Sequence, residues 1–319
     1  MPPQHNPTLG IFFVILGMTC ITLNDMLIKL LSGGYPLHQL VFFRSIIAVV
    51  FSLALVQLEG GFRILRTDRP LLHLSRVMLL VVSNLSFFTA LAVMPLADAT
   101  AMFFVAPLFI TLLSIPILGE KVGIHRISAI IVGLIGVVVV QQPWNGASDG
   151  GPGKLVLLLP VLAAFTYSLC QILTRRLGVT AKASAMAVYM QSTFVVVSSG
   201  FWLLAGDGRY AMGLDDPSLQ FLLRAWRWPD QDDWLLFLAL GGLNGVIGYS
   251  IAQAYRSAKA ATVAPFEYVA LPLAMLWGWL IFDHLPSATV LGGIALIMGA
   301  GLYVFLREQR QEYGENNGP

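Results

Sequence analysis

Three ionisable residues, Asp25, Arg44 and Glu267, lie inside stretches that are otherwise almost entirely apolar. A charge at the centre of a membrane-spanning helix costs about 2.5–3.5 kcal/mol, so such residues usually pair, meet water or bind a ligand. Asp25 and Arg44 fall on consecutive apolar stretches at similar depth, which favours an ion pair or a shared aqueous vestibule. Glu267 lies between Pro265 and Pro272, which free backbone carbonyls that need other partners. We therefore predict that all three contact a substrate or an ion; purely structural ion pairing, snorkelling or interhelical hydrogen bonding is the alternative.

Neutral hydrogen-bonding side chains accompany these charges inside the apolar stretches. In membrane helices such groups join neighbouring helices, at about 0.6–2 kcal/mol each, as often as they contact ligands. We include five of them with the three charges in one predicted substrate or ion pathway: Asn84, Asn244, Tyr249, Gln253 and Tyr268.

Signatures of metal or nucleotide chemistry are missing from the sequence. No HExxH, Walker A or GxGxxG pattern occurs, and the histidines are dispersed. Cys20 and Cys170 both lie in apolar stretches without CxxC spacing. We therefore expect no catalytic residue, no metal site and no cofactor. Without an ATP-binding motif, any transport must be driven by a gradient, such as one of protons, or by exchange.

The overall composition places these residues in lipid. Of the 319 residues, 57% are hydrophobic and only 11% are charged, whereas a soluble protein carries roughly 25% charged residues. A soluble fold of this size could not cover its surface with so few charges, so the surrounding solvent must be a lipid bilayer. The net charge of +2 gives no basis for binding nucleic acid.

Ten stretches are long and apolar enough to cross the hydrocarbon core, which takes about 20 residues. Runs such as Ile127–Val140 and Leu155–Ala164 are apolar on every face, whereas the strands of a membrane barrel would alternate. The first lacks the basic flank and the cleavage site of a signal peptide, so we expect it to be retained. The sequence thus predicts an all-α integral membrane protein with ten transmembrane helices. The predicted spans are 9–31, 37–57, 71–93, 97–117, 124–141, 155–174, 183–204, 234–256, 261–282 and 286–305.

The two halves of the chain resemble each other in four places, in the same order. Residues 24–32 match 170–178 and residues 42–45 match 189–192, which places Arg44 opposite Gln191. Residues 97–101 then match 260–264, and 119–120 match 282–283; the long connection 205–233 explains the changed offset. We predict a first five-helix repeat at 9–141, a linker at 142–154, a second repeat at 155–305 and a tail at 306–319.

The basic residues of the loops predict the orientation of these helices. With the N-terminus inside, 13 of the 19 Lys and Arg fall in cytoplasmic segments and five in outer ones. Both termini are therefore expected in the cytoplasm. Because five helices is an odd number, the two repeats must insert in opposite orientations, as in many secondary transporters whose substrate site lies between the repeats.

Three segments carry a resemblance to a known family: FFRSIIA at 42–48, the run from Ala90 to Gly123 that contains PLADATA and GEKVG, and the run from Ala254 to Phe282 that contains APFEY. With them the whole chain resembles the drug/metabolite transporter superfamily, and within it the ten-helix members with two EamA-type repeats. The APFEY run is similar to the branch that contains bacterial riboflavin and S-adenosylmethionine uptake proteins. Phe282-Asp283 replaces the Gly-Glu that ends the corresponding helix in the family.

The resemblance implies a secondary transporter of a bacterial inner membrane that moves a small organic metabolite by alternating access. A vitamin such as riboflavin, or a nucleoside-like solute, is the substrate that it favours. Export of amino acids or drugs is the alternative within the superfamily, and an intramembrane enzyme is the alternative outside it. By position, the resemblance puts Arg44, Glu267 and Tyr268 nearest the central cavity.

Overall fold

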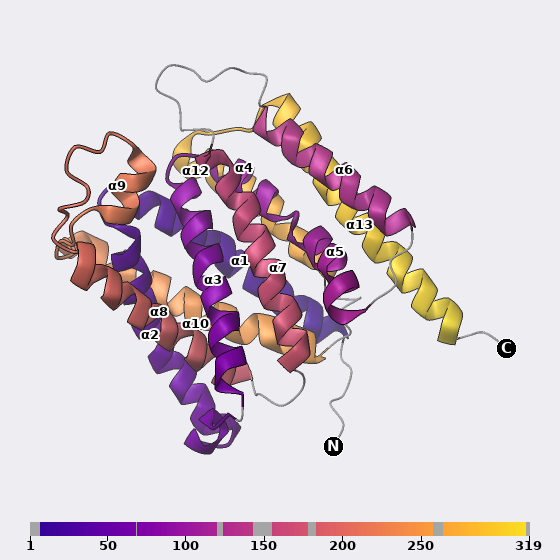
Figure 1. Cartoon of the computed structure of the whole chain (residues 1–319), viewed down its shortest axis with the longest axis horizontal. Coiled ribbons are helices and arrows are strands. Elements are labelled where there is room, and N and C mark those ends of the chain that lie inside the picture. The colour runs from indigo at the N-terminus through magenta and orange to yellow at the C-terminus, as the bar shows by residue number, and fades with distance from the viewer. Residues whose placement is uncertain are drawn as a thin grey trace.

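A computed structural model describes residues 7–67, 69–119, 124–142, 155–177, 183–257 and 264–316 of the chain. Within these ranges the chain forms a bundle of helices without strands (Figure 1), as predicted. The long helices are α1 (Pro7–Leu31), α2 (Leu37–Glu59), α3 (Pro70–Leu91), α6 (Ile124–Gln141), α7 (Leu159–Leu177), α8 (Ala183–Ala205), α10 (Trp234–Ser257) and α13 (Ala288–Asn316).

Seven helical segments among the described residues are long and apolar enough to cross a membrane, one of them being Leu96–Ile117. Three shorter apolar segments accompany them: Ile127–Gln141, Phe266–Phe282 and Ala288–Tyr303. The chain is therefore an integral membrane protein with many spans. Each predicted span coincides with a helical segment, although α13 continues beyond the predicted end at 305 to Asn316. Residues 307–312 of this extension, REQRQE, are mostly good helix formers, which explains why the helix extends into polar sequence.

The fourth and ninth predicted spans are both irregular. The fourth consists of α4 (Leu96–Phe103) and α5 (Ala106–Leu118), so the continuous helix expected at 97–117 is interrupted between them. Pro107 lacks the N–H group that would continue the hydrogen bonding of α4, and it is well placed in the first turn of α5. The ninth span begins as the 3₁₀ helix η5 (Ala264–Val269) and continues as α12 (Ala270–Phe282).

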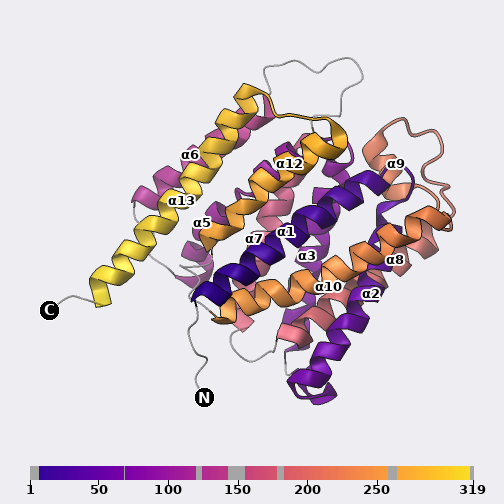
Figure 2. The ribbon, with the colours of Figure 1, turned by 180° about the vertical axis from the view of Figure 1, so that it is seen from behind.

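The helices pack in pairs that are far apart in the sequence. The helix α1 lies along α10, α3 along α7, α2 along α8 and α6 along α13, as Figures 1 and 2 show from opposite sides. The pair α6 and α13 approaches closely at two glycines. A Cβ atom at Gly136 would lie 2.9 Å from the carbonyl oxygen of Gly293, and one at Gly293 would lie 2.8 Å from that of Gly136. Small residues allow such contact between membrane helices.

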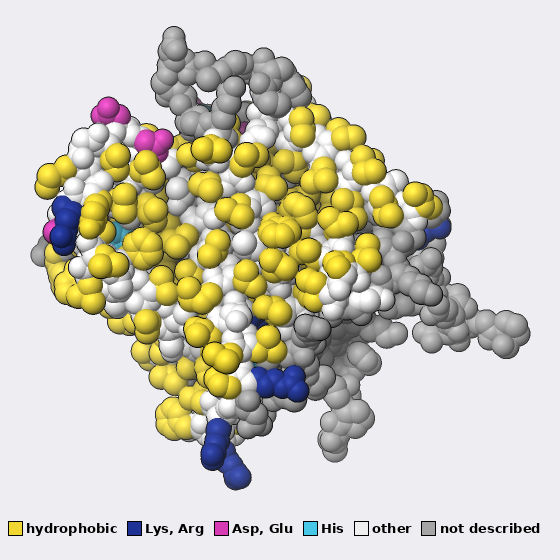
Figure 3. Space-filling model, in the orientation of Figure 1, with side chains coloured by type: hydrophobic (Ala, Val, Ile, Leu, Met, Phe, Trp, Pro, Cys, Tyr) yellow, Lys and Arg dark blue, Asp and Glu magenta, His cyan; other side chains and the backbone are white. Residues whose placement is uncertain are grey.

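Apolar side chains cover the middle of the face seen in Figure 3, and acidic and basic side chains appear toward its edges. This distribution suits a molecule whose belt faces lipid and whose ends face water. We call the end of the bundle with Leu31, Leu91 and Phe282 the cap end, and the end with Pro7 and Glu59 the tail end.

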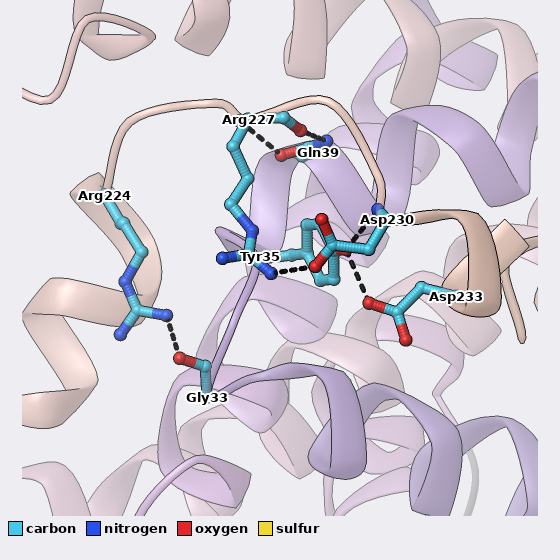
Figure 4. A network of polar contacts seen from close by, with 7 residues as sticks. All are labelled: Gly33, Tyr35, Gln39, Arg224, Arg227, Asp230 and Asp233. Atoms are coloured by element: carbon cyan, nitrogen blue, oxygen red, sulfur yellow. Dashed lines mark hydrogen bonds and ion pairs between the residues drawn. The ribbon is translucent and has the colours of Figure 1, made fainter.

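The connection between α8 and α10, which contains the short helix α9 (Pro217–Leu223), covers the turn between α1 and α2 at the cap end (Figure 4). Arg224 donates a hydrogen bond of 2.5 Å to the carbonyl oxygen of Gly33. The buried Tyr35 hydroxyl donates to Asp233 and accepts from the backbone N–H of Asp230, at 3.0 Å.

The second contact of this connection joins Arg227 to α2. The Gln39 side chain donates a hydrogen bond to the backbone carbonyl oxygen of Arg227, at 2.6 Å, and accepts one from the backbone N–H of Arg227, at 3.3 Å. The Tyr35 hydroxyl, together with the charge of Asp230, raises the pKa of the Arg227 guanidinium, which also lies over the Tyr35 ring. These contacts hold the turn between α1 and α2 to the segment that leads into α10.

Candidate functional site

Arg44, in the middle of α2, is the centre of a polar cluster inside the bundle. Its side chain is 3% exposed, and its Nη2 donates a hydrogen bond of 2.7 Å to the Asn84 side chain on α3. The guanidinium lies over the rings of Phe88 and Phe194, at 5.2 and 5.8 Å from their centroids. These cation–π contacts hold the charge without neutralising it. The Nε–H of Arg44 has no hydrogen-bond partner among the described residues.

Asp25, on α1, belongs to the same cluster. Its carboxylate accepts a hydrogen bond of 3.1 Å from the side chain of Asn24, and it interacts electrostatically with Arg44. Among the described residues, no direct ion pair joins Asp25 to Arg44. The sequence favours an ion pair or a shared aqueous vestibule for these two residues. In the structure Arg44 is hydrogen-bonded to Asn84 and lies over the two phenylalanines. A role of Asp25 and Arg44 in binding a substrate or an ion stays a prediction.

A second polar pair lies in the other half of the chain. Asn244, on α10, donates a hydrogen bond of 3.2 Å to Gln191 on α8, whose side chain is buried. Gln191 is the residue that the predicted repeat places opposite Arg44. Among the described residues, both halves have a polar hydrogen bond between their second and third predicted spans: Arg44 with Asn84, and Gln191 with Asn244.

A row of aromatic rings connects the Arg44 cluster with α4 and α7. Phe88 contacts Phe87, Phe87 contacts Phe103, and Phe103 contacts Tyr167, with centroids 5.3 to 5.4 Å apart at each step. Tyr167 in turn accepts a hydrogen bond from Gln171. These rings lie edge-on or tilted to one another, the arrangement that aromatic pairs prefer, and Phe87 and Phe88 are buried.

Glu267 and Tyr268 lie in η5, where the irregular fourth and ninth spans meet. The Tyr268 ring is buried and packs on Phe104, at the interruption between α4 and α5, with centroids 5.5 Å apart. Glu267 is half-buried and lies near enough to Tyr167 for its charge to act on that hydroxyl. Discontinuous spans of this kind mark binding sites in transporters, because their backbone groups are available to ligands.

The remaining predicted residues, Tyr249 and Gln253, lie toward the tail end of α10. Tyr249 is 38% exposed and packs edge-on against Phe13 of α1. Gln253 is half-buried. Their place on the pathway stays a prediction.

Sequence reasoning missed several residues of this region. Phe88, Phe194 and Gln191 were not among the predicted site residues, although the alignment of the two halves had placed Gln191 opposite Arg44. The phenylalanines had no distinguishing signal, because the apolar stretches contain many aromatic residues that serve only as packing.

The arrangement defines a class of protein. Many apolar spans surround a buried cluster of opposite charges and amides, beside two interrupted spans. Membrane proteins retain such costly interior groups chiefly along paths for substrates or ions. The fold and the site are those of a membrane transporter.

Comparisons with known proteins give the family. A model of the EamA-like transporter family matches residues 8–141. The chain is 30% identical over 305 residues to the riboflavin transporter of Rhizobium johnstonii, covering 95% of this chain and 93% of that one. It is 25% identical to the S-adenosylmethionine uptake transporter of Rickettsia prowazekii, covering 94% of each chain. This chain belongs to the EamA-like transporter family, as the resemblance predicted, and it is a transporter rather than an enzyme.

A solved crystal structure supports the fold independently. It superposes with a TM-score of 0.64 and covers 97% of this chain and 99% of its own, at 22% sequence identity. This likeness concerns the arrangement of the helices and not the substrate.

Proposed function

We propose that this protein is a secondary transporter of a bacterial inner membrane that imports a small organic metabolite by alternating access. The contact between Tyr268 and the interruption of the fourth span at Phe104 carries the proposal, since it brings both irregular spans to the interior of the bundle. The substrate would meet the Arg44 cluster toward one side of this contact and Glu267 on the other. The transport would be driven by a gradient or by exchange.

The transporter would consist of two inverted repeats, 9–141 and 155–305, with ten spans in total. The helix pairing supports this proposal. In the proposed repeat, α1, α2, α3 and α6 are equivalent to α7, α8, α10 and α13. The pair of α1 with α10 is then equivalent to the pair of α7 with α3. The pairs α2 with α8 and α6 with α13 each join two equivalent helices. The matching polar pairs and the matching irregular spans follow the same exchange.

The cap end would face outward and both termini would lie in the cytoplasm. Reporter fusions after Pro319 are expected to signal cytoplasm, and fusions near Ser148 are expected to signal the outside. If both fusions report the same compartment, the ten-span arrangement is wrong, because an odd number of spans must separate the two positions.

A planar heteroaromatic vitamin such as riboflavin, or a nucleoside-like solute, is the proposed substrate. The rings from Phe88 to Tyr167 would supply stacking surfaces once the bundle opens around them, and Arg44 and the amides would supply hydrogen bonds at the end of this row. The curated relatives named above transport riboflavin or S-adenosylmethionine, both of which contain such a ring. Export of amino acids or drugs is the second candidate within the family.

Ligand binding and transport by the purified protein test the proposal. Riboflavin, S-adenosylmethionine, nucleosides and amino acids are screened for a rise in melting temperature, since a ligand that binds only the folded state stabilises it. Ligands that bind are then measured as labelled solutes in proteoliposomes. Stabilisation and saturable flux with a heteroaromatic solute are expected. Flux of amino acids alone favours the export candidate, and conversion of a solute without flux contradicts transport.

A further inference from the structure

A cavity of about 210 Å³ lies at the cap end, apart from the Arg44 cluster. It is enclosed by the start of α4, the end of α6, and the segment from α12 into α13. Its polar lining consists of Asp98, Gln142, His284 and Ser287. At the liquid's volume of about 30 Å³ per molecule, it is large enough to hold several waters. The cavity thus connects a carboxylate to the aqueous end of the bundle.

Asp98, in the first turn of α4, has an unsatisfied carboxylate in this cavity. Its Oδ1 is buried, and within the described part of the chain it has no hydrogen-bond partner. A carboxylate oxygen without a donor is costly unless a proton, water or ligand reaches it. The Asp98 side chain is part of the cavity lining, which brings water to the carboxyl group although Oδ1 itself is covered.

Two positively charged or titratable groups act on Asp98 from different elements. Lys29, at the end of α1, and His284, in the segment that follows α12, both interact with it electrostatically. Neither forms a direct ion pair with it among the described residues. Lys29 instead donates to the carbonyl oxygens of Leu91 and Met94, at 2.7 and 2.6 Å, so its ammonium is fixed at the turn between α3 and α4.

Among the described ionisable side chains, only Asp98 and His284 line this cavity. Asp283 is exposed and does not belong to the lining, and the parts of α6 and α13 that border it contribute only neutral groups. The titratable groups of α7 near α4, Tyr167 and Cys170, do not line the cavity either. Asp98 is therefore the described carboxylate whose charge attracts α1 and the segment between α12 and α13 toward α4.

We propose that Asp98 binds a proton from the water at the cap end, and that this protonation loosens the closure of that end. The inference rests on the alternating access of the proposed function. A hydronium ion in the cavity transfers its proton to the Asp98 carboxylate and leaves water; the reverse transfer restores the carboxylate. While Asp98 is ionised, its attraction for the Lys29 ammonium, and for His284 whenever that imidazole is protonated, holds these elements together. Once it is neutral, that attraction is lost and the cavity widens.

The closed state also has a neutral contact across the cavity. The Gln142 side chain donates a hydrogen bond of 3.3 Å to the Ser287 hydroxyl, joining the end of α6 to the start of α13. Val290, one turn into α13, lines the cavity and is only 5% exposed. Leu285 lines it too, but is 70% exposed. A cysteine at Val290 therefore reports opening, and one at Leu285 serves as a matched control.

Thiol labelling of the full-length protein in detergent tests the proposal without requiring transport. Both native cysteines, Cys20 and Cys170, are buried and are replaced by alanine. The rate of maleimide labelling at Val290→Cys is divided by the rate at Leu285→Cys, which removes the pH dependence of the thiol itself. The ratio is followed from about pH 8 to about pH 5, the range in which histidine also titrates. We expect it to rise several-fold as the pH falls.

Variants identify the proton site. In Asp98→Asn the ratio is expected to be high and independent of pH, and in His284→Gln the rise is expected to remain. In Asp98→Glu the rise remains with a shifted midpoint, a result that stays informative if Asp98→Asn does not fold. The proposal is overturned if the ratio does not change with pH in the protein that retains Asp98. It is also overturned if the rise persists in Asp98→Asn or if the midpoint is unchanged in Asp98→Glu. Because labelling needs no substrate, the proposed function can fail in the flux assay while this inference stands, and the reverse also holds.

Discussion

The replacement Asn84→Leu removes the acceptor that orients Arg44, with little change of side-chain volume. The lost hydrogen bond is charge-assisted, 2.7 Å long and made to an Arg44 side chain that is 3% exposed. Hydrogen bonds to charged groups contribute about 1.5–3 kcal/mol in soluble proteins. Measured values between membrane helices are lower, averaging about 0.6 and reaching about 1.7 kcal/mol. We therefore expect a loss of about 1–2 kcal/mol, near the upper end for membranes.

If Arg44 contacts the substrate, this loss appears in binding. A change of 1.4 kcal/mol is tenfold in an equilibrium constant, so the substrate Kd is expected to rise about 5- to 30-fold. The measurement is the ligand concentration needed for half of the maximal thermal shift, with the flux KM in proteoliposomes beside it. The melting temperature without ligand shows how much of the loss concerns folding alone.

The second polar pair of the chain provides the matched control. Asn244→Leu removes a longer bond of 3.2 Å between two neutral amides. Its effect on ligand affinity is expected to be the smaller of the two, at most about fivefold, since such bonds average about 0.6 kcal/mol. Equal effects of the two replacements, or an unchanged Kd in Asn84→Leu, refute the reasoning that Arg44 is positioned for the substrate.

Three further predictions concern other parts of the molecule. Glu267→Gln keeps the shape of the side chain but removes its charge, so we expect normal folding with loss of most flux or of its pH dependence; normal flux with an unchanged pH profile would make the carboxylate structural. Tyr35→Phe removes both hydrogen bonds of a hydroxyl on a buried ring and should lower stability by about 1–3 kcal/mol, measured as detergent melting temperature, while Tyr210→Phe, on an exposed ring, should not. Gly301→Ala puts a methyl group where the Tyr268 hydroxyl lies and should destabilise by about 1–3 kcal/mol, whereas an alanine at Gly299, which meets no atom within 4 Å, should be neutral or better.

The sequence alone determined the helical membrane class and the positions of the helices. Twenty apolar residues can satisfy their backbone in lipid only as a helix, so the pattern that predicted 37–57 and 234–256 was sufficient for α2 and α10. It also predicted Asp25 and Arg44 as interior charges, because any charge inside such a stretch stands out against its neighbours.

The partners of those charges were decided by the tertiary structure. Arg44 selects Asn84, Phe88 and Phe194 rather than Asp25, which depends on how α2, α3 and α8 are rotated against one another. These helices are apolar over most of their surface, so the periodicity of the sequence says little about that rotation. The cavity around Asp98 was unpredictable for a related reason. It forms only where α4, α6 and the segment after α12 meet, from residues that lie far apart in the sequence.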